Sequence, residues 1–207
     1  MFRWGLYSLR NLWARRVTTA LTVVGLGLVV FVLLAVLMLA HGLEQTLGKT
    51  GDPENVIILR KGALSEIGSS LSREEIRAVA AQPDVRLTAD GRPLAVAEVG
   101  LQLTLRKGQG GSLTSVTLRG TAPEALAVRP AIRLIQGRLW KPGTTEIVVG
   151  ASIANQFPDA RVDRVLHFGN RAWAVVGVLE AGGSGFDSEV WGDAEQFLAT
   201  FHRTTFS

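Results

Sequence analysis

The chain has 207 residues, of which 47% are hydrophobic and 19% charged, which excludes intrinsic disorder and suffices for a membrane segment plus a domain with its own core. Its net charge of +4 comes from the N-terminus, because four of the 22 basic residues (Arg3, Arg10, Arg15 and Arg16) precede the first acidic residue, Glu44, and the other 18 balance the 18 Asp and Glu. Since the region after the apolar run is neutral, no nucleic-acid partner is expected.

Residues 17–40 form an uninterrupted apolar segment without a charge. As a helix this segment would be about 36 Å long, enough to cross a hydrocarbon core of about 30 Å. A cleaved signal peptide has an apolar stretch of only about 7–15 residues and small residues at the cut, whereas Met38 and Leu39 precede Ala40 here. We therefore predict an uncleaved transmembrane helix that continues to about residue 47. The arginines ahead of it place the N-terminus in the cytoplasm and the rest of the chain outside it.

The segment before the span, residues 1–16, carries apolar side chains at helical spacing, namely Phe2, Leu6, Leu9 and Trp13. This spacing predicts an amphipathic helix that lies in the cytoplasmic membrane interface and contacts lipid. Two roles stay open for it: a topology anchor alone, or a surface that touches a cytoplasmic partner. Within the span, Gly25 and Gly27 form part of a small-residue surface on which another transmembrane helix could pack.

Punctuated segments follow the span and indicate a folded domain. The apolar run at residues 55–60 predicts a buried strand. Ser72 followed by Glu75 is a capping-box pattern, which predicts a helix over residues 73–81 that ends before a proline. Residues 94–106 form a long extended run, and residues 115–119 are expected to pair with it across a glycine-rich hairpin tip.

A second group of segments predicts a β-rich unit with one helix. Strands are expected in AIRLIQGRLW, EIVVG, RVLHF and AWAVVGVLE, a short helix in SIANQF, and a final helix over residues 193–201. The fold class is therefore α+β: a single N-terminal transmembrane helix followed by a two-lobed extracytoplasmic domain. Residues 51–122 and 180–207 would form the first α/β lobe, and residues 123–179 an inserted β-rich second lobe. Residues 204–207 have the composition of a strand just beginning, so we expect the chain to be an incomplete folding unit at its C-terminus.

No catalytic, cofactor or metal site is predicted. The chain has no cysteine, and its three histidines (His41, His167 and His202) lack any ligand spacing. Asp187, Ser188 and Glu189 could be imagined with a histidine as a hydrolase triad, but no nucleophile-elbow pattern surrounds any serine, so loop or capping roles are favoured. The glycine cluster at residues 107–111 lacks the pattern of a phosphate-binding loop, so the chain is not expected to hydrolyse ATP.

Four stretches, in this order, carry a resemblance to a known family: RNLWARRVTTALTVVGLGL, GDPENVIILRKGALSE with SSLSREE, GRLWKPGTTEIVVG, and WAVVGVLEAGGSGFDSEVWGD. Together they resemble the first transmembrane helix and the periplasmic core domain of MacB/FtsX-type ABC transporter permeases, over nearly the entire chain. The resemblance implies a two-lobed core domain in a permease homodimer or heterodimer of the inner (plasma) membrane. It also implies a separate cytoplasmic ABC ATPase as the motor and a periplasmic adaptor protein as a further candidate partner.

The function implied by the resemblance is mechanotransmission, in which ATP-driven helix movement reaches the extracytoplasmic domain without catalysis by this chain. Complete members of the family have three further transmembrane helices, and residues 41–207 contain no second apolar stretch near 20 residues. A fragment, a split gene product and a single-pass protein therefore all stay open. The alternative function is a single-pass, membrane-anchored envelope binding or scaffold protein that acts without an ATPase.

Overall fold

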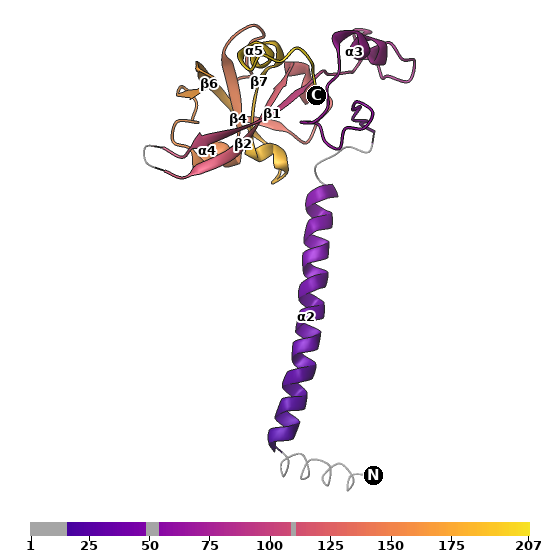
Figure 1. Cartoon of the computed structure of the whole chain (residues 1–207), viewed down its shortest axis with the longest axis vertical. Coiled ribbons are helices and arrows are strands. Elements are labelled where there is room, and N and C mark those ends of the chain that lie inside the picture. Colours follow the sequence, from indigo (N-terminus) through magenta and orange to yellow (C-terminus); the bar gives the residue numbers. More distant parts are fainter. Residues whose placement is uncertain (1–15, 49–53, 109–110) are drawn as a thin grey trace. The chain divides into compact units, whose positions relative to one another are not determined.

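The computed structural model describes residues 16–48, 54–108 and 111–207 (Figure 1). Two compact units divide the chain between residues 48 and 49. The predicted amphipathic segment at residues 1–16 falls, apart from Arg16, outside the described residues.

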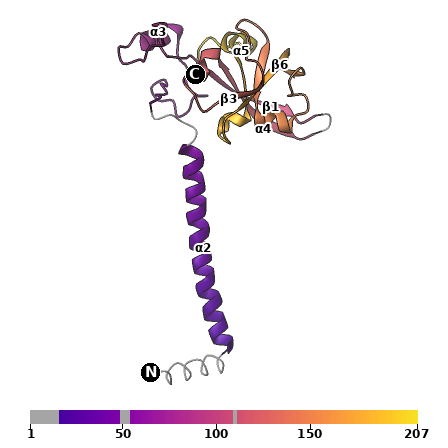
Figure 2. The same cartoon turned by 180° about the vertical axis from the view of Figure 1, so that it is seen from behind.

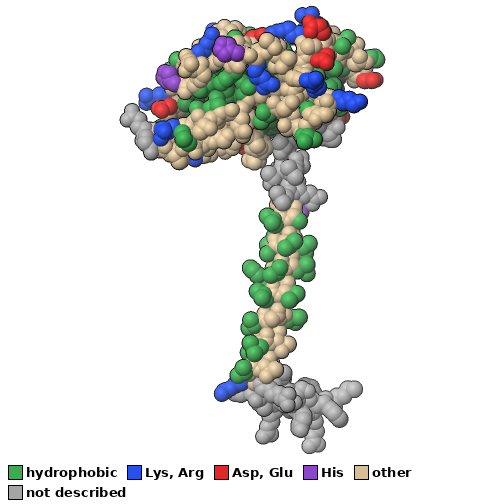
Figure 3. Space-filling view, in the orientation of Figure 1, with side chains coloured by type: hydrophobic (Ala, Val, Ile, Leu, Met, Phe, Trp, Pro, Cys, Tyr) green, Lys and Arg blue, Asp and Glu red, His purple; other side chains and the backbone are tan. Residues whose placement is uncertain are grey.

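Helix α2 (Arg16–Gly48) forms the described part of the first unit. Its portion Arg16–Gly42 is long and apolar enough to cross a membrane, and Figure 3 shows hydrophobic side chains along its visible face and a Lys or Arg side chain at its start. The prediction of a helix over residues 17–40 that continues to about residue 47 is confirmed. Thr22 Oγ1 donates to the Thr18 carbonyl at 2.9 Å, which satisfies its hydroxyl where the bilayer offers no partner.

A curled seven-stranded sheet forms the second unit. Its strands are β1 (Val99–Arg106), β2 (Leu113–Thr121), β3 (Arg133–Gly137), β4 (Glu146–Gly150), β5 (Val165–Phe168), β6 (Arg171–Glu180) and β7 (Glu189–Asp193). They follow the order β1-β2-β7-β4-β6-β3, and β5 also pairs with β6 (Figures 1 and 2). The pairs β2–β7 and β4–β6 are parallel, and the others are antiparallel. The predicted mixed helix-and-strand fold is confirmed.

The strands that lie within residues 123–179 occupy one end of this sheet, and the remaining strands occupy the other end. The two ends meet where β7 pairs with β4, with Val148 opposite Trp191. One sheet thus contains strands from both expected lobes. The division into a lobe of residues 51–122 and 180–207 and an inserted lobe of residues 123–179 stays a prediction.

Three short α-helices and two 3-10 helices accompany the sheet: α3 (Arg73–Ala80), α4 (Ala151–Gln156), α5 (Ala194–Thr200), η1 (Pro123–Leu126) and η2 (Gly185–Ser188). Helix α3 begins with the predicted capping box, because the Ser72 hydroxyl accepts from the Glu75 N–H at 3.2 Å and the Ser72 N–H donates to the Glu75 carboxylate at 2.7 Å. Asp193 caps α5 by accepting from the Glu195 N–H at 2.9 Å. Both helices lie where the sequence predicts them.

The larger core cluster centres on aromatic side chains. Trp173 stacks on Phe168 with ring centroids 5.0 Å apart, and Phe197 of α5 meets Trp173 edge-on at 4.9 Å. Gly120 of β2 lets α5 approach this closely, because a Cβ at that position would lie 2.9 Å from Ala194 Cα. A second buried cluster contains Trp140 and Trp191.

Two predicted strands differ from the structure. Residues 55–60 form no strand, and three of their four apolar side chains are exposed, with Val56 at 81% and Ile57 at 66%. The prediction was wrong because composition favours a strand there, but no strand of the described sheet runs alongside. The extended run predicted over 94–106 enters the sheet only at Val99, since Val99 opposite Gly120 is the first pair of the hairpin.

Candidate functional site around Arg119

Arg119 lies at the centre of a buried cluster of charged side chains. Along β2 its neighbours Leu118 and Gly120 turn to the larger core, so the alternation of a strand turns Arg119 to the opposite face. There its guanidinium carbon lies 5.2 Å from the centre of the Phe186 ring and 5.7 Å from that of Trp191, the residue opposite it on β7. Only 7% of the Arg119 side chain is exposed.

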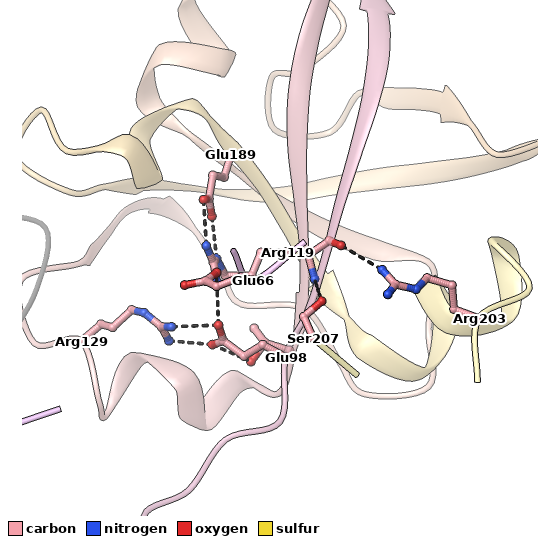
Figure 4. Close-up of polar contacts among 9 residues, drawn as sticks. Glu66, Glu98, Arg119, Arg129, Glu189, Arg203 and Ser207 are labelled. Carbon is pink, nitrogen blue, oxygen red and sulfur yellow. Dashed lines mark hydrogen bonds and ion pairs between the residues drawn. The ribbon is translucent and has the colours of Figure 1, made fainter. Parts of the chain in front are cut away.

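Three carboxylates surround the Arg119 guanidinium (Figure 4). Glu189, at the start of β7, accepts from Nε at 2.7 Å and from Nη2 at 3.0 Å, which makes a bidentate pair. Glu98 and Glu66 both accept from Nη1, at 2.6 Å and 2.9 Å. Arg129 adds a second cation, since its two Nη atoms donate to Glu98 at 2.7 and 2.8 Å.

The five ionic groups of this Arg119 cluster, two guanidinium groups and three carboxylates, give a net charge of about −1. Burial acts to lower the pKa of Arg119, but the hydrogen bonds and charge of Glu189, followed by the charges of Glu98 and Glu66, raise that pKa above its ordinary value. Arg119 therefore stays charged. Removing Arg119 would leave the Glu189 carboxylate, which is 11% exposed, without a cation in a buried place.

Glu66 connects this cluster to the first part of the domain. It belongs to the segment of residues 54–71, whose last residue, Leu71, pairs with Phe206 through hydrogen bonds of 2.8 and 3.0 Å. The next residue, Ser207, donates its N–H to the Glu98 carbonyl at 2.7 Å, and its hydroxyl accepts from the Gly100 N–H at 2.9 Å.

Arg203, in the C-terminal segment, also contacts both residues 54–71 and the start of β1. Its Nη1 donates to the Gly100 carbonyl at 3.1 Å, and its Nη2 donates to the Ser69 carbonyl at 3.4 Å. Residues 54–71 and residues 203–207 thus lie side by side at the start of β1, as both cartoon views show (Figures 1 and 2). For residues 204–207, predicted as the beginning of a strand, the structure shows one isolated bridge at Phe206.

The chemistry that this arrangement supports is structural linkage. Every carboxylate of the cluster is held by a guanidinium, so none is placed to move a proton or coordinate a metal ion. Among the described residues, no group of three or more His, Asp or Glu side chains gathers as metal ligands do.

The residues considered as a hydrolase triad have separate structural roles. The Asp187 carboxylate accepts from the Ala181 and Gly183 N–H groups at 2.6 Å each, which caps the loop ahead of it. Glu189 is paired with Arg119. His167 and His202 are exposed. The structure therefore places Asp187 in the loop role that its sequence context favours.

The Arg119 cluster was not predicted from the sequence. A weak signal was present, since a charged residue at position 119, between Leu118 and Gly120, ends an expected strand. The partners could not be identified, because Glu189, Glu66 and Glu98 lie 70, 53 and 21 residues away from Arg119 along the chain.

Comparisons with known proteins identify the family and the fold of the chain. A family model described as MacB-like periplasmic core domain matches residues 19–206. Among solved structures, the extracellular domain of the noncanonic ABC-type transporter YknZ from Gram-positive bacteria matches with a TM-score of 0.52 and 19% identity, over 67% of this chain and 70% of that one. The periplasmic region of MacB from Actinobacillus actinomycetemcomitans matches with a TM-score of 0.53 and 16% identity, over 72% of this chain and 68% of that one. At these identities the likeness shows the fold. No curated protein matches the chain.

Proposed function

Because the chain belongs to the family of proteins with a MacB-like periplasmic core domain, we propose that it is the N-terminal part of an ABC transporter permease subunit of the mechanotransmission type. The observation that carries this proposal is the extent of the family match, which runs from residue 19 to residue 206 and so includes both the apolar helix and the folded domain. In this function a separate cytoplasmic ABC ATPase supplies the energy, and the chain itself catalyses no reaction.

Helix α2 is the element that would carry movement across the membrane. It has 33 residues in one unbroken helix, which corresponds to a length of about 50 Å. The apolar part ends near residue 40, so the helix extends beyond the hydrocarbon core by about two turns. A continuous helix moves as one rigid element, and its displacement would therefore reach the segment that follows it.

The Arg119 cluster supports this function by joining that following segment to the sheet. Residues 54–71 are attached to the sheet through Glu66 and Arg119, and to residues 203–207 through the Leu71–Phe206 pair. A pull on either segment acts on the start of β1. The proposed role of the cluster is to transmit displacement of these segments to the sheet, because it keeps them attached to the sheet under load.

The proposed setting is the inner (plasma) membrane, with the N-terminus in the cytoplasm and the domain in the extracytoplasmic space. The arginines before the span support this orientation. Protease added to the outside of spheroplasts should digest the chain after about residue 50 and spare the N-terminal arginine segment. Protection of the domain in intact spheroplasts, with digestion after lysis, would contradict the topology.

The partners proposed are the cytoplasmic ATPase and a second permease subunit, identical or different. Purification of the tagged full chain in a mild detergent should recover an ABC ATPase in stoichiometric amount. The matched control replaces residues 17–40 by an unrelated transmembrane helix, which keeps the domain anchored and should lose the ATPase. If the natural chain is folded and repeatedly recovers no ATPase, the permease function is wrong and an anchored envelope scaffold takes its place.

A further inference from the structure

A groove of about 660 Å³ runs beside the segment that precedes β1. None of the five residues of the Arg119 cluster lines it, so it is a separate feature of the domain. Its volume lies in the range of ligand pockets, about 300–1,000 Å³. Apolar side chains make up much of its lining, among them Ile76, Leu94, Val96, Trp140 and Phe206.

One wall of this groove is a stretch of backbone, residues 95–97, that belongs to no strand and has no backbone partner among the described residues. Residues 94–98 run ahead of β1, whose pairing with β2 begins only at Val99. Ala95, Val96 and Ala97 line the groove, and none of them makes a backbone hydrogen bond to another described residue. Unpaired N–H and C=O groups beside an apolar groove form a template for an added strand.

Two unpaired charges also line the groove. Arg77 of α3 and Glu124 of η1 form no ion pair with any described residue. The other charged groups of the lining are engaged: Arg73 pairs with Glu195 at 2.6 Å, Arg92 pairs with Asp90 at 2.9 Å, and the Asp193 carboxylate accepts backbone N–H groups.

We propose that this groove binds an extended peptide segment of a partner protein, which adds as a strand along residues 95–97. An alternating peptide presents apolar side chains to the groove, donors and acceptors to Ala95–Ala97, and one charge of each sign to Arg77 and Glu124. A wholly apolar ligand would leave the backbone groups unpaired, and a simple anion would be repelled by the Glu124 carboxylate. The proposal concerns partner recognition and does not depend on an ATPase.

The absence of cysteine from the sequence allows the groove to be probed with a single dye. Pro142 lines the groove and is exposed, so the full chain with Pro142→Cys, labelled with an environment-sensitive fluorophore, reports on occupancy. The matched control carries the label at Asp159→Cys, an exposed position outside the groove. The probes are two blocked heptapeptides, acetyl-Lys-Thr-Val-Thr-Val-Thr-Glu-amide and acetyl-Glu-Thr-Val-Thr-Val-Thr-Lys-amide, which present the two charge orders with both charges on the face of the valines.

Strand addition makes a specific demand on the peptide backbone. Successive N–H groups of a strand point to opposite edges, so N-methylation of the Val amides blocks one edge, and N-methylation of the Thr amides blocks the other. We expect a saturable change at position 142 with at least one peptide, and its loss with one methylated form but not with the other. No saturable change with either peptide, equal behaviour of the two methylated forms, or an equal response at position 159 would overturn the proposal.

Charge variants test the two unpaired charges of the lining, Arg77 and Glu124. Arg77→Glu and Glu124→Lys should each weaken binding of the preferred peptide by about two- to fivefold, as expected for exposed ion pairs. The double variant should prefer the peptide of the opposite charge order. Unchanged melting of each variant shows that the domain is folded, and unchanged peptide preference in the double variant would contradict the assignment of Arg77 and Glu124.

Discussion

Replacing Arg119 by methionine tests the central ionic cluster. In this variant Glu98 keeps Arg129, and Glu66, which is about one-third exposed, can turn toward water. Glu189 has only 11% of its side chain exposed and loses its bidentate partner. The variant therefore leaves one buried carboxylate without a cation.

The expected cost follows from this stranded charge. Removing one partner of a buried ion pair destabilises a protein by about 3–5 kcal/mol. For a protein of this size each kcal/mol lowers the melting temperature by about 2–4 °C, so Arg119→Met should lower it by roughly 6–20 °C. The matched control is Arg92→Met, whose ion pair with Asp90 is about two-thirds exposed. That change should cost less than about 1 kcal/mol.

The assay is thermal unfolding of the purified full chain, followed by circular dichroism. The double variant Arg119→Met with Glu189→Leu removes the stranded carboxylate and should recover most of the loss, because a buried ion pair can be replaced by apolar side chains at little cost. If Arg119→Met melts no lower than Arg92→Met, or if the two changes in the double variant simply add, the reasoning is refuted.

Three further predictions concern other parts of the chain. The hydrogen bond from Arg138 lowers the pKa of Glu146 from 4.5 to about 2, so this pair contributes stability above pH 4.5 and loses it as the pH falls from 4.5 to 2. Glu146→Gln should therefore reduce the dependence of the melting temperature on pH between pH 4.5 and 2. An unchanged dependence would contradict the contribution of the pair. Gly120→Ala should cost about 1–3 kcal/mol in denaturant unfolding, because its Cβ would lie 2.5 Å from a side-chain atom of the adjacent strand, whereas Gly185→Ala, with nothing within 4 Å, should be nearly neutral. A Cβ at Gly25 would have no described atom within 4 Å beyond its own turn of the helix, so Gly25→Leu should leave the helix intact and reduce cross-linking between helices in membranes. Unchanged cross-linking would contradict the helix interface.

Elements specified by local chemistry could be predicted from the sequence. The capping box at Ser72 and Glu75 fixes the start of α3 within four residues. The hairpin of β5 and β6 turns at Gly169 and Asn170, whose positive φ angles of 58° and 57° suit the tight two-residue turn that such strands require. In both cases the signal and the structure that it specifies lie within a few residues of each other.

Elements specified by distant partners could not be predicted in the same way. Residues 55–60 have the composition of a buried strand, but a strand needs a neighbour, and sequence composition does not show whether one is in place. The Arg119 cluster has the same difficulty in a stronger form, because its five charged residues are spread from position 66 to position 189 of the chain. The identity of a charged residue does not indicate which distant carboxylate will neutralise it.

The position of β7 in the sheet sets an order of assembly for the domain. This strand lies between β2 and β4, yet Glu189–Asp193 is the last of the seven strands along the chain. At about 5–20 residues per second, synthesis of the residues between the end of β2 and the start of β7 takes about 3–14 s. Until β7 arrives, the β1–β2 hairpin and the group of β3 to β6 each expose an open strand edge. The newly made chain therefore needs protection from association during this interval, and the protection must act on the side of the membrane where the domain folds.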